Sequence, residues 1–508
     1  MNVLTYNPTT GESELTDFVE STAADVALMC AHARLAASVL AGKSLVWRAG
    51  LLEAIAVNLE ADAPTIIALA DAETGLGETR LTGELKRTCF QFRFFANVVR
   101  DGSFLEASID HAYDSPMGPL PDLRRQLEPL GVVGVFGASN FPLAFSVPGG
   151  DTASALAAGC SVVIKAHPAH PRTSFATFSA VDRAARDQGA PEATVSLIFG
   201  LEAGIALVEN TEVAAVGFTG SYAAGRALCN RAQAREVPIP FYGELGSVNP
   251  LVVSPSAAAE RAVALGEGLV ASVTLGSGQF CTKPGLLFVP VGVDGDALVA
   301  SAITALKKGA GATMLSASIR EHFEASVDEL AGQGGLELLA RSTSSPSDAG
   351  SFAALFGVDV ATLGSQREAL MREYFGALAV IVRYESFDQL DAALDSLDPA
   401  LTFTLHVSDD DEMAPALLAR GVTKAGRVIV NGYPTGVGVS WSMHHGGPHP
   451  AATNSLFTSV GATAIRRWLR PVSYQGVAAK WLPDTLRDDN PLEIPQRIDG
   501  IPFGRVVS

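Results

Sequence analysis

The segment Val132-Val133-Gly134-Val135-Phe136 is short, apolar and rich in β-branched residues, which is typical of a strand buried on both faces. Similar segments follow it at residues 161–164, 195–198 and 214–218. Helical patterns lie between them at residues 153–159, 174–188 and 203–209. Strands that alternate with helices predict an α/β fold with a parallel, Rossmann-like sheet covered by helices on both faces. Such sheets bind ligands at the carboxyl ends of their strands, so the loops after these segments are the expected binding site.

Three of these loops carry residues that suit a ligand. Asn140 follows the first strand and can present a side-chain NH₂ group, and Lys165 places a cation at the end of the second. The stretch Gly220-Ser221-Tyr222-Ala223-Ala224-Gly225 follows the fourth strand and reads as a glycine-opened helix start, which can direct backbone N–H groups at a phosphate. Each feature alone is common in turns and on surfaces. Together at one edge of one sheet, they predict a dinucleotide site.

The composition limits the possible partners and compartment. A chain of 508 residues that is 48% hydrophobic can form two or three domains. The net charge of −18 disfavours nucleic acid and anionic membranes as partners, because both are bound by concentrated Lys and Arg. The five cysteines are widely spaced and form no CxxC pair, which indicates neither a disulfide framework nor a metal site. We therefore expect a reducing compartment, the cytoplasm.

One uncharged stretch of the chain could be interpreted as a membrane span. Residues 131–150 contain no charged residue and are long enough to cross a bilayer. Their glycines and prolines favour a buried strand followed by a functional loop instead. The segment Met1 to Asp17 contains acidic residues and no apolar core, so it does not resemble a signal peptide. We expect no membrane association.

The N-terminal third is predicted to be helical. Apolar residues recur at helical spacing in four segments, at residues 23–39, 47–59, 63–71 and 84–99. We interpret these stripes as packing faces without chemistry. Residues 101–122 break the pattern with three prolines and a glycine between residues 116 and 121, which suits an excursion from the main body.

Cys281 is the candidate nucleophile. It lies in Gly276-Ser277-Gly278-Gln279-Phe280-Cys281-Thr282, between a helical run at residues 261–275 and a predicted strand at residues 285–290. A cysteine on a glycine-bracketed loop is accessible to a substrate, which suits a thiolate nucleophile. The alternative, a small buried hydrophobic residue, is the more common fate of a single cysteine.

Glu244 is the candidate base. It stands between glycines in the apolar run from Tyr242 to Pro250. We expect the apolar setting to raise the pKa of this carboxyl and make it usable as a base near neutral pH. Further along, Glu373 and Phe375 precede a predicted strand at residues 379–382, and another strand is expected at residues 426–431. The loop from Gly432 to Pro450 is rich in Gly, Pro, His and Trp and is expected to form a pocket wall.

Six motifs, in order along nearly the whole chain, resemble the NAD(P)-dependent aldehyde dehydrogenase superfamily. They are Ser139-Asn140-Phe141-Pro142, Val163-Ile164-Lys165, Phe218-Thr219-Gly220-Ser221, Glu244-Leu245-Gly246, Gly278-Gln279-Phe280-Cys281-Thr282 and Glu373-Tyr374-Phe375-Gly376. Two further stretches are most similar to the branch of 2-oxoglutarate semialdehyde (2,5-dioxopentanoate) and bacterial fatty-aldehyde dehydrogenases. They are residues 280–285 and 430–437.

The resemblance implies a catalytic mechanism. The Cys281 thiolate would attack the aldehyde, while the Asn140 amide and the Cys281 backbone N–H hold the oxyanion. Hydride transfer to nicotinamide would leave a thioester on the enzyme. Glu244 would then activate the water that releases the acid, which argues against an enzyme that transfers the acyl group to coenzyme A.

The resemblance also implies cofactor contacts. Lys165 would bind the adenosine ribose. Gly220 and Ser221 would bind the pyrophosphate, beside the helix start that includes Gly225. Glu373 would bind the nicotinamide ribose, and Phe375 would pack beside it. Many NAD-preferring relatives carry a glutamate three residues after the lysine, where this chain has Pro168. Losing that carboxylate removes repulsion of a 2′-phosphate and favours NADP, with NAD as the alternative. Glu202 opposes this preference, and the candidates to bind the phosphate are His167, His170 and Arg172.

The substrate is less constrained. A semialdehyde needs a cation to pair with its distal carboxylate. The branch often has an arginine just before the Thr458-Ser459-Val460-Gly461 motif, but this chain has Leu456-Phe457 there, with Arg466 and Arg467 further on. A less polar aldehyde, such as a medium- or long-chain one, therefore stays open beside 2,5-dioxopentanoate. An inactive scaffold protein and a thiol esterase are the alternatives from other classes, but nucleophile, base and cofactor residues are all present.

We expect three parts in the fold. Residues 1–104 and 124–242 are assigned to the cofactor domain and residues 243–440 to the catalytic domain. Residues 105–123 and 450–508 are assigned to a small β oligomerisation arm, which implies a homodimer or homotetramer.

Overall fold

The predicted parallel sheet is present and has five strands in the order β11-β10-β7-β8-β9. The computed structural model describes residues 1–502. The strands are β7 (Val132–Phe136), β8 (Ser161–Lys165), β9 (Val195–Ile198), β10 (Val213–Thr219) and β11 (Phe241–Glu244). All neighbouring pairs are parallel. Each of the four predicted strands is therefore correct to within one residue at either end.

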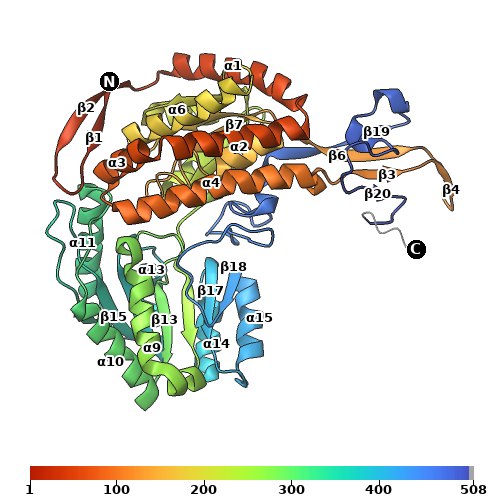
Figure 1. The fold of residues 1–508 in the computed structure, drawn as a ribbon. Coiled ribbons are helices and arrows are strands. Elements are labelled where there is room, and N and C mark those ends of the chain that lie inside the picture. The colour runs from red at the N-terminus through yellow and green to blue at the C-terminus, as the bar shows by residue number, and fades with distance from the viewer. Residues whose placement is uncertain (503–508) are drawn as a thin grey trace.

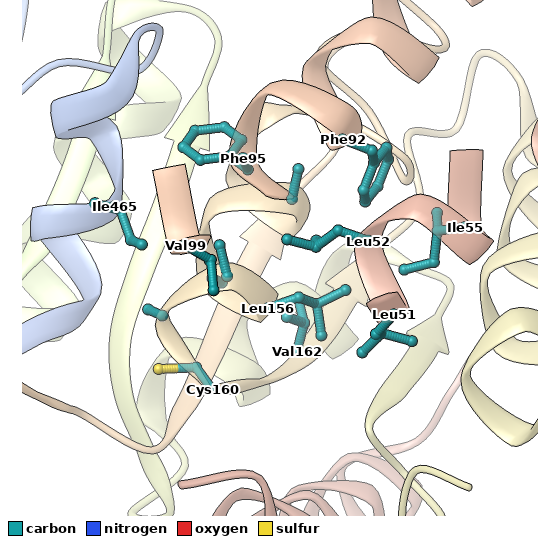
Figure 2. Packing of buried hydrophobic residues seen from close by; sticks show 14 of the residues in the cluster. Leu51, Leu52, Ile55, Phe92, Phe95, Val99, Leu156, Cys160, Val162 and Ile465 are labelled. Atoms are coloured by element: carbon teal, nitrogen blue, oxygen red, sulfur yellow. The ribbon is translucent and has the colours of Figure 1, made fainter. Parts of the chain in front are cut away.

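Helices cover both faces of this sheet, as expected for buried parallel strands. One face carries α2 (Leu45–Ala61), α3 (Ala63–Thr74), α4 (Glu78–Asp101), α5 (Gly150–Ala158) and α6 (Pro171–Asp187). The other carries α1 (Ala23–Ala41), α7 (Leu201–Glu209) and α8 (Tyr222–Ala234). Figure 2 shows the first core, in which Leu52 of α2 and Phe92 and Phe95 of α4 pack towards Leu156 and Val162. This packing fixes the rotation of α4 about its own axis.

Within residues 1–502, α1 is the one helix whose length and mean hydropathy would suffice to cross a membrane. A third of that window is buried, and the helix packs against β8 and α7. The uncharged residues 131–150 form β7, a loop and the start of α5.

The second sheet has seven strands in the order β14-β15-β16-β13-β12-β17-β18. They are β12 (Pro250–Val253), β13 (Leu286–Pro290), β14 (Glu337–Arg341), β15 (Ala354–Asp359), β16 (Leu378–Tyr384), β17 (Ala400–His406) and β18 (Ala425–Val430). Only β14 runs antiparallel to its neighbour. The accompanying helices are α9 (Pro255–Thr274), α10 (Val293–Lys308), α11 (Ala317–Ala331), α12 (Val360–Ser365), α13 (Arg367–Leu370), α14 (Phe387–Ser396) and α15 (Ala414–Lys424).

A third sheet joins distant parts of the chain in the order β19-β6-β3-β20. Its strands are β3 (Ser108–Asp110), β6 (Leu123–Pro129), β19 (Leu469–Gln475) and β20 (Arg497–Ile498). It extends from the body together with the hairpin of β4 (Tyr113–Ser115) and β5 (Gly118–Leu120), whereas β1 (Asn2–Tyr6) and β2 (Ser13–Val19) pair separately (Figure 1). The division into domains given above stays a prediction.

Candidate active site

The loops after β7, β8 and β10 meet because β7 lies between β8 and β10. Phe136 at the end of β7 pairs with Lys165 on one side and Phe218 on the other. One residue further, Thr219 of β10 pairs with Glu244 of β11. From β7 the chain adds β8 and β9 on one side of the sheet and then β10 and β11 on the other side. Open α/β sheets form a ligand crevice at the point where the order of the strands reverses in this way.

A cavity of about 700 Å³ opens at this crevice. Its lining includes Asn140, Lys165, Gly220, Ser221, Glu244, Cys281, Glu373 and Phe375. The structure thus brings together all but one of the site residues predicted from the sequence. The exception is Gly225, where an added Cβ would lie 2.2 Å from Leu245 Cδ2. Gly225 lets α8 pack closely against the strands and does not line the cavity.

The residues at the β10 and β8 ends suit a dinucleotide. Ser221 caps α8, with its side chain accepting from the Ala224 backbone N–H at 3.4 Å, so the helix begins at the cavity wall. A helix start of this kind favours negatively charged groups such as a pyrophosphate. Burial lowers the pKa of Lys165 to about 8, yet its ammonium remains mostly charged at neutral pH.

The candidates for a 2′-phosphate contact differ in their partners. His167 lines the cavity. His170 lies at hydrogen-bond distance from Ser174 Oγ and from the carbonyl of Ala138, and Arg172 pairs with Glu14. His167 is therefore the one of the three that faces the cavity.

The Cys281 loop begins where α9 ends. Gly276, Ser277 and Gly278 all have positive φ, at 57°, 59° and 68°. A Cβ on Gly278 would lie 2.3 Å from the carbonyl of Gly376, so glycine is required for this approach. Ser277, which lacks this freedom, is held by a hydrogen bond from its hydroxyl to the carbonyl of Thr313 at 2.9 Å. The loop is thereby set in one conformation.

Asn249 holds the other side of the loop, and the sequence analysis assigned it no role. Its buried side-chain amide donates to the carbonyl of Cys281 at 2.7 Å and to that of Lys283 at 3.1 Å. Its side-chain oxygen accepts from the backbone N–H of Thr402 at 3.1 Å. The residue has φ 51°, which asparagine tolerates better than most. An asparagine directly before Pro250 was the available signal.

Asn140 lies against the same loop. Its side-chain Nδ2 donates to the backbone carbonyl of Gln279 at 2.8 Å. The backbone carbonyl of Asn140 accepts from Arg80 Nη2 at 2.6 Å. One N–H of the amide is thus used to position the group. The second is available to a substrate oxygen beside Cys281.

His445 completes the site, and the sequence analysis did not single it out. Its Nε2 lies 2.9 Å from Glu244 Oε1 and 3.5 Å from Cys281 Sγ. The hydroxyl of Ser459 donates to the other oxygen of Glu244 at 2.8 Å. His445 belongs to the loop at residues 432–450 that we expected to form a pocket wall, but nothing in the sequence indicated which residue would reach Cys281.

His445 overturns the expected pKa of Glu244. Burial alone would raise the pKa of this carboxyl, but the imidazole of His445 and hydrogen bonds from His445 and Ser459 hold it below its usual value. Burial and the nearby Glu244 carboxylate raise the pKa of the Cys281 thiol well above its ordinary value. The cluster therefore rests as an ionised carboxylate beside a protonated thiol, and the thiol needs a base to react.

The same three groups are of the types that bind metals. One donor atom each from Cys281, His445 and Glu244 lies within 4.8 Å of the others. These atoms also hydrogen-bond to one another, so the geometry equally suits proton transfer.

Glu373 occupies the wall between Cys281 and the cofactor loops. Burial raises the pKa of Glu373 to about 7, with the Ser247 N–H and Lys283 acting in the opposite direction. A Cβ at Gly246 would lie 2.5 Å from Glu373 Oε2, so the glycine leaves space for this carboxyl. A carboxylate here can accept hydrogen bonds from two ribose hydroxyls.

The match to a protein family decides the class of this site. The model of the aldehyde dehydrogenase family matches residues 2–468. The chain belongs to the aldehyde dehydrogenase family. The predicted enzyme class and fold are thus confirmed.

Two relatives are similar over most of their length. This aldehyde dehydrogenase is 45% identical to alpha-ketoglutaric semialdehyde dehydrogenase 2 of Azospirillum brasilense, covering 97% of this chain and 95% of that protein. It is 41% identical to alpha-ketoglutaric semialdehyde dehydrogenase of Acinetobacter baylyi, covering 89% and 87%.

Solved structures share the fold at low identity. Aldehyde Dehydrogenase C from Pseudomonas syringae, in complex with NAD+ and octanal, matches with a TM-score of 0.80 at 19% identity, covering 94% of each chain. The glyceraldehyde-3-phosphate dehydrogenase GapN of Methanocaldococcus jannaschii, in complex with NADP, matches with a TM-score of 0.80 at 18% identity, covering 93% of this chain and 98% of that one.

Proposed function

We propose that this aldehyde dehydrogenase oxidises 2,5-dioxopentanoate to 2-oxoglutarate with NADP⁺. The observation that supports the reaction type best is the contact of His445 Nε2 with both Cys281 Sγ and Glu244 Oε1, beside the Asn140 amide. Similarity to two named semialdehyde dehydrogenases supports the choice of substrate.

Cys281 acts first in the proposed mechanism. As its sulfur attacks the aldehyde carbon, the S–H bond breaks, and the thiol proton passes to His445 Nε2, 3.5 Å from the sulfur, and from there to Glu244 Oε1, 2.9 Å from that nitrogen. The Asn140 amide and the Cys281 backbone N–H stabilise the negative charge that develops on the oxygen. Donors of this kind contribute on the order of 3 kcal/mol each to the barrier.

A bound nicotinamide dinucleotide supplies the acceptor for the hydride that leaves the thiohemiacetal on Cys281. Glu373 and Phe375 orient the nicotinamide end, and Ser221 with the start of α8 holds the pyrophosphate. The thioester that remains on Cys281 is released by water. Once Glu244 has released the thiol proton to solvent, its carboxylate takes the proton of this water, and its lowered pKa favours the ionised form that this role needs.

The charge of the cavity supports NADP over NAD. Glu244 and Glu373 are the two carboxylates among its lining residues in the described part of the chain, and both lie near Cys281. Lys165, His167 and Arg231 also line the cavity, but burial holds the pKa of His167 well below its ordinary value, and Arg231 pairs with Glu209. A 2′-phosphate at the adenosine end would therefore have the Lys165 ammonium as its cationic partner.

We further propose a cytoplasmic homodimer or homotetramer that assembles through the third sheet. This sheet and the β4–β5 hairpin extend from the body (Figure 1) and expose Met117 and Leu120. Sedimentation velocity would measure the mass in solution, and a monomer would contradict this assignment.

Initial rates with two aldehydes and two cofactors test the function. We expect kcat/KM for 2,5-dioxopentanoate to exceed that for pentanal, and NADP⁺ to be preferred to NAD⁺. Equal values for the two aldehydes would remove the substrate assignment, and the absence of any cofactor reduction would remove the activity.

A further inference from the structure

Three residues on one face of α4 are directed at the catalytic loops. Arg80, Glu84 and Arg87 are spaced four and three residues apart, which places them on the same side of a helix. The packing of Phe92 and Phe95 of the same helix into the core holds the helix in this rotation (Figure 2). The sequence analysis interpreted this helix as a packing element alone, so its charged face is a new feature.

Arg80 and Glu84 have structural partners. Arg80 donates to the Asn140 carbonyl and lies 5.1 Å from the ring centroids of Phe141 and Phe280. Glu84 accepts from the backbone N–H of Leu143 and of Ala144, each at 2.9 Å. Both residues support the loop that carries Asn140.

Arg87 and Arg427 approach one short loop from different elements. Arg427, on β18, donates to the carbonyl of Gly436 at 2.9 Å, and two nitrogens of Arg87 lie 3.4 Å from the carbonyl of the next residue, Val437. Both guanidinium groups therefore contact the same two-residue stretch of this loop.

Arg87 is connected to the catalytic cysteine through aromatic rings. Its guanidinium lies 5.0 Å from the centroid of the Phe145 ring, and that ring lies 6.4 Å from the imidazole of His445. Burial lowers the pKa of both Arg87 and Arg427; negative charge on Glu84 and then on Cys281 opposes the shift for Arg87, and charge on Cys281 and Glu244 opposes it for Arg427. The two arginines therefore lie within electrostatic reach of the reacting sulfur.

Neither guanidinium has a carboxylate partner. Among residues 1–502, no ion pair involves Arg87 or Arg427, and buried Arg87 Nη1 and Arg427 Nε have no hydrogen-bond partner. Arg466 and Arg467, the arginines considered from the sequence, pair with Glu106 and Asp151 instead. Each guanidinium thus keeps a buried N–H donor that is costly unless a ligand supplies an acceptor.

We infer that Arg87 and Arg427 bind the carboxylate at the end of the substrate distant from the aldehyde. The inference rests on the proposed function, because only an aldehyde with a distal carboxylate uses this pair. Arginine presents several N–H donors in one plane, which matches the two oxygens of a carboxylate. Phe145, which lies between Arg87 and His445, would contact the carbon chain.

The test is the ratio of kcat/KM for 2,5-dioxopentanoate to kcat/KM for pentanal, measured with NADP⁺. We expect this ratio to fall about 100-fold in Arg87→Gln and in Arg427→Gln, since each loses charge-assisted hydrogen bonds to the carboxylate. Arg87→Lys keeps the charge but loses the planar geometry, so its ratio should fall about 10-fold. The loss should appear mainly in KM for the semialdehyde.

Arg93→Gln is the matched control on the same helix, because Arg93 is exposed and pairs with Glu60. Its ratio should equal that of the wild type, and thermal unfolding should show all variants folded. Since the arginines lie on different elements, a folding failure in one leaves the other to decide. A wild type without preference for the semialdehyde would refute the proposed function. A wild-type preference that both glutamine variants retain, or an equal loss for both aldehydes, would overturn the inference alone.

Discussion

Replacing His445 by asparagine tests the part of the site that links the nucleophile to the base. The substitution removes the 2.9 Å hydrogen bond to Glu244 and the 3.5 Å contact with Cys281 Sγ. A hydrogen bond to a charged group contributes about 2 kcal/mol, or roughly 30-fold in rate. A positioned proton acceptor contributes on the order of 10²-fold or more. We expect kcat/KM to fall by about 10²- to 10³-fold.

The pH profile of His445→Asn separates a chemical role from a structural one. Burial raises the pKa of Glu244 and His445 lowers it, so removing the imidazole should raise it. The acid limb of the kcat/KM profile should therefore move to higher pH. Alkylation of Cys281 by iodoacetamide should also become slower, because the thiol loses its proton acceptor.

His444→Asn is the matched control, since this neighbouring histidine contacts neither Cys281 nor Glu244 among the hydrogen bonds of the described chain. Its kcat/KM should stay within about 2-fold of the wild type, as for most substitutions away from a site. A loss below about 5-fold in His445→Asn, with an unshifted acid limb, would refute the proposed relay.

Two further predictions concern cofactor binding and the Cys281 loop. The affinity for NADP⁺, measured by fluorescence titration, should weaken as the pH falls through about 7, because protonated Glu373 accepts ribose hydrogen bonds poorly. The Glu373→Gln variant should bind NADP⁺ weakly at every pH. If this variant kept the pH dependence of the wild type, Glu373 would be excluded as its cause. Asn249→Asp loses the donors to the carbonyls of Cys281 and Lys283 and should destabilise the fold by about 2 kcal/mol in chemical denaturation. Wild-type stability in Asn249→Asp would show that the loop is held by other contacts.

The sequence was most informative where local composition decides the structure. The strand at residues 132–136 was predicted correctly because an apolar, β-branched run can be satisfied only inside a sheet. Helix ends were less accurate. The segment predicted as a helix at residues 261–275 matches the part of α9 that follows a break at Arg261, where φ is −148°, but the first part of α9, which begins at Pro255 after a Ser254 cap, was missed. A single proline and serine were too weak a signal to move the predicted start.

The sequence was least informative where partners come from distant segments. His445 reaches Cys281 across 164 residues, so neither its contact nor its effect on the pKa of Glu244 was visible. The charged face of α4 was missed for a related reason. The helix was interpreted from its apolar stripe alone, and the unpartnered Nη1 of Arg87 becomes apparent only when its surroundings are known.

Mass spectrometry of a trapped intermediate tests the central claim most directly. Glu244→Gln keeps Cys281 and its neighbouring proton acceptor His445 but lacks the base that activates water, so acylation should proceed more slowly and the acyl group should remain on the enzyme. After incubation with 2,5-dioxopentanoate and NADP⁺, we expect one equivalent of reduced cofactor and an acyl adduct on the peptide that contains Cys281. An adduct on another cysteine, or turnover at the wild-type rate without any adduct, would contradict the account.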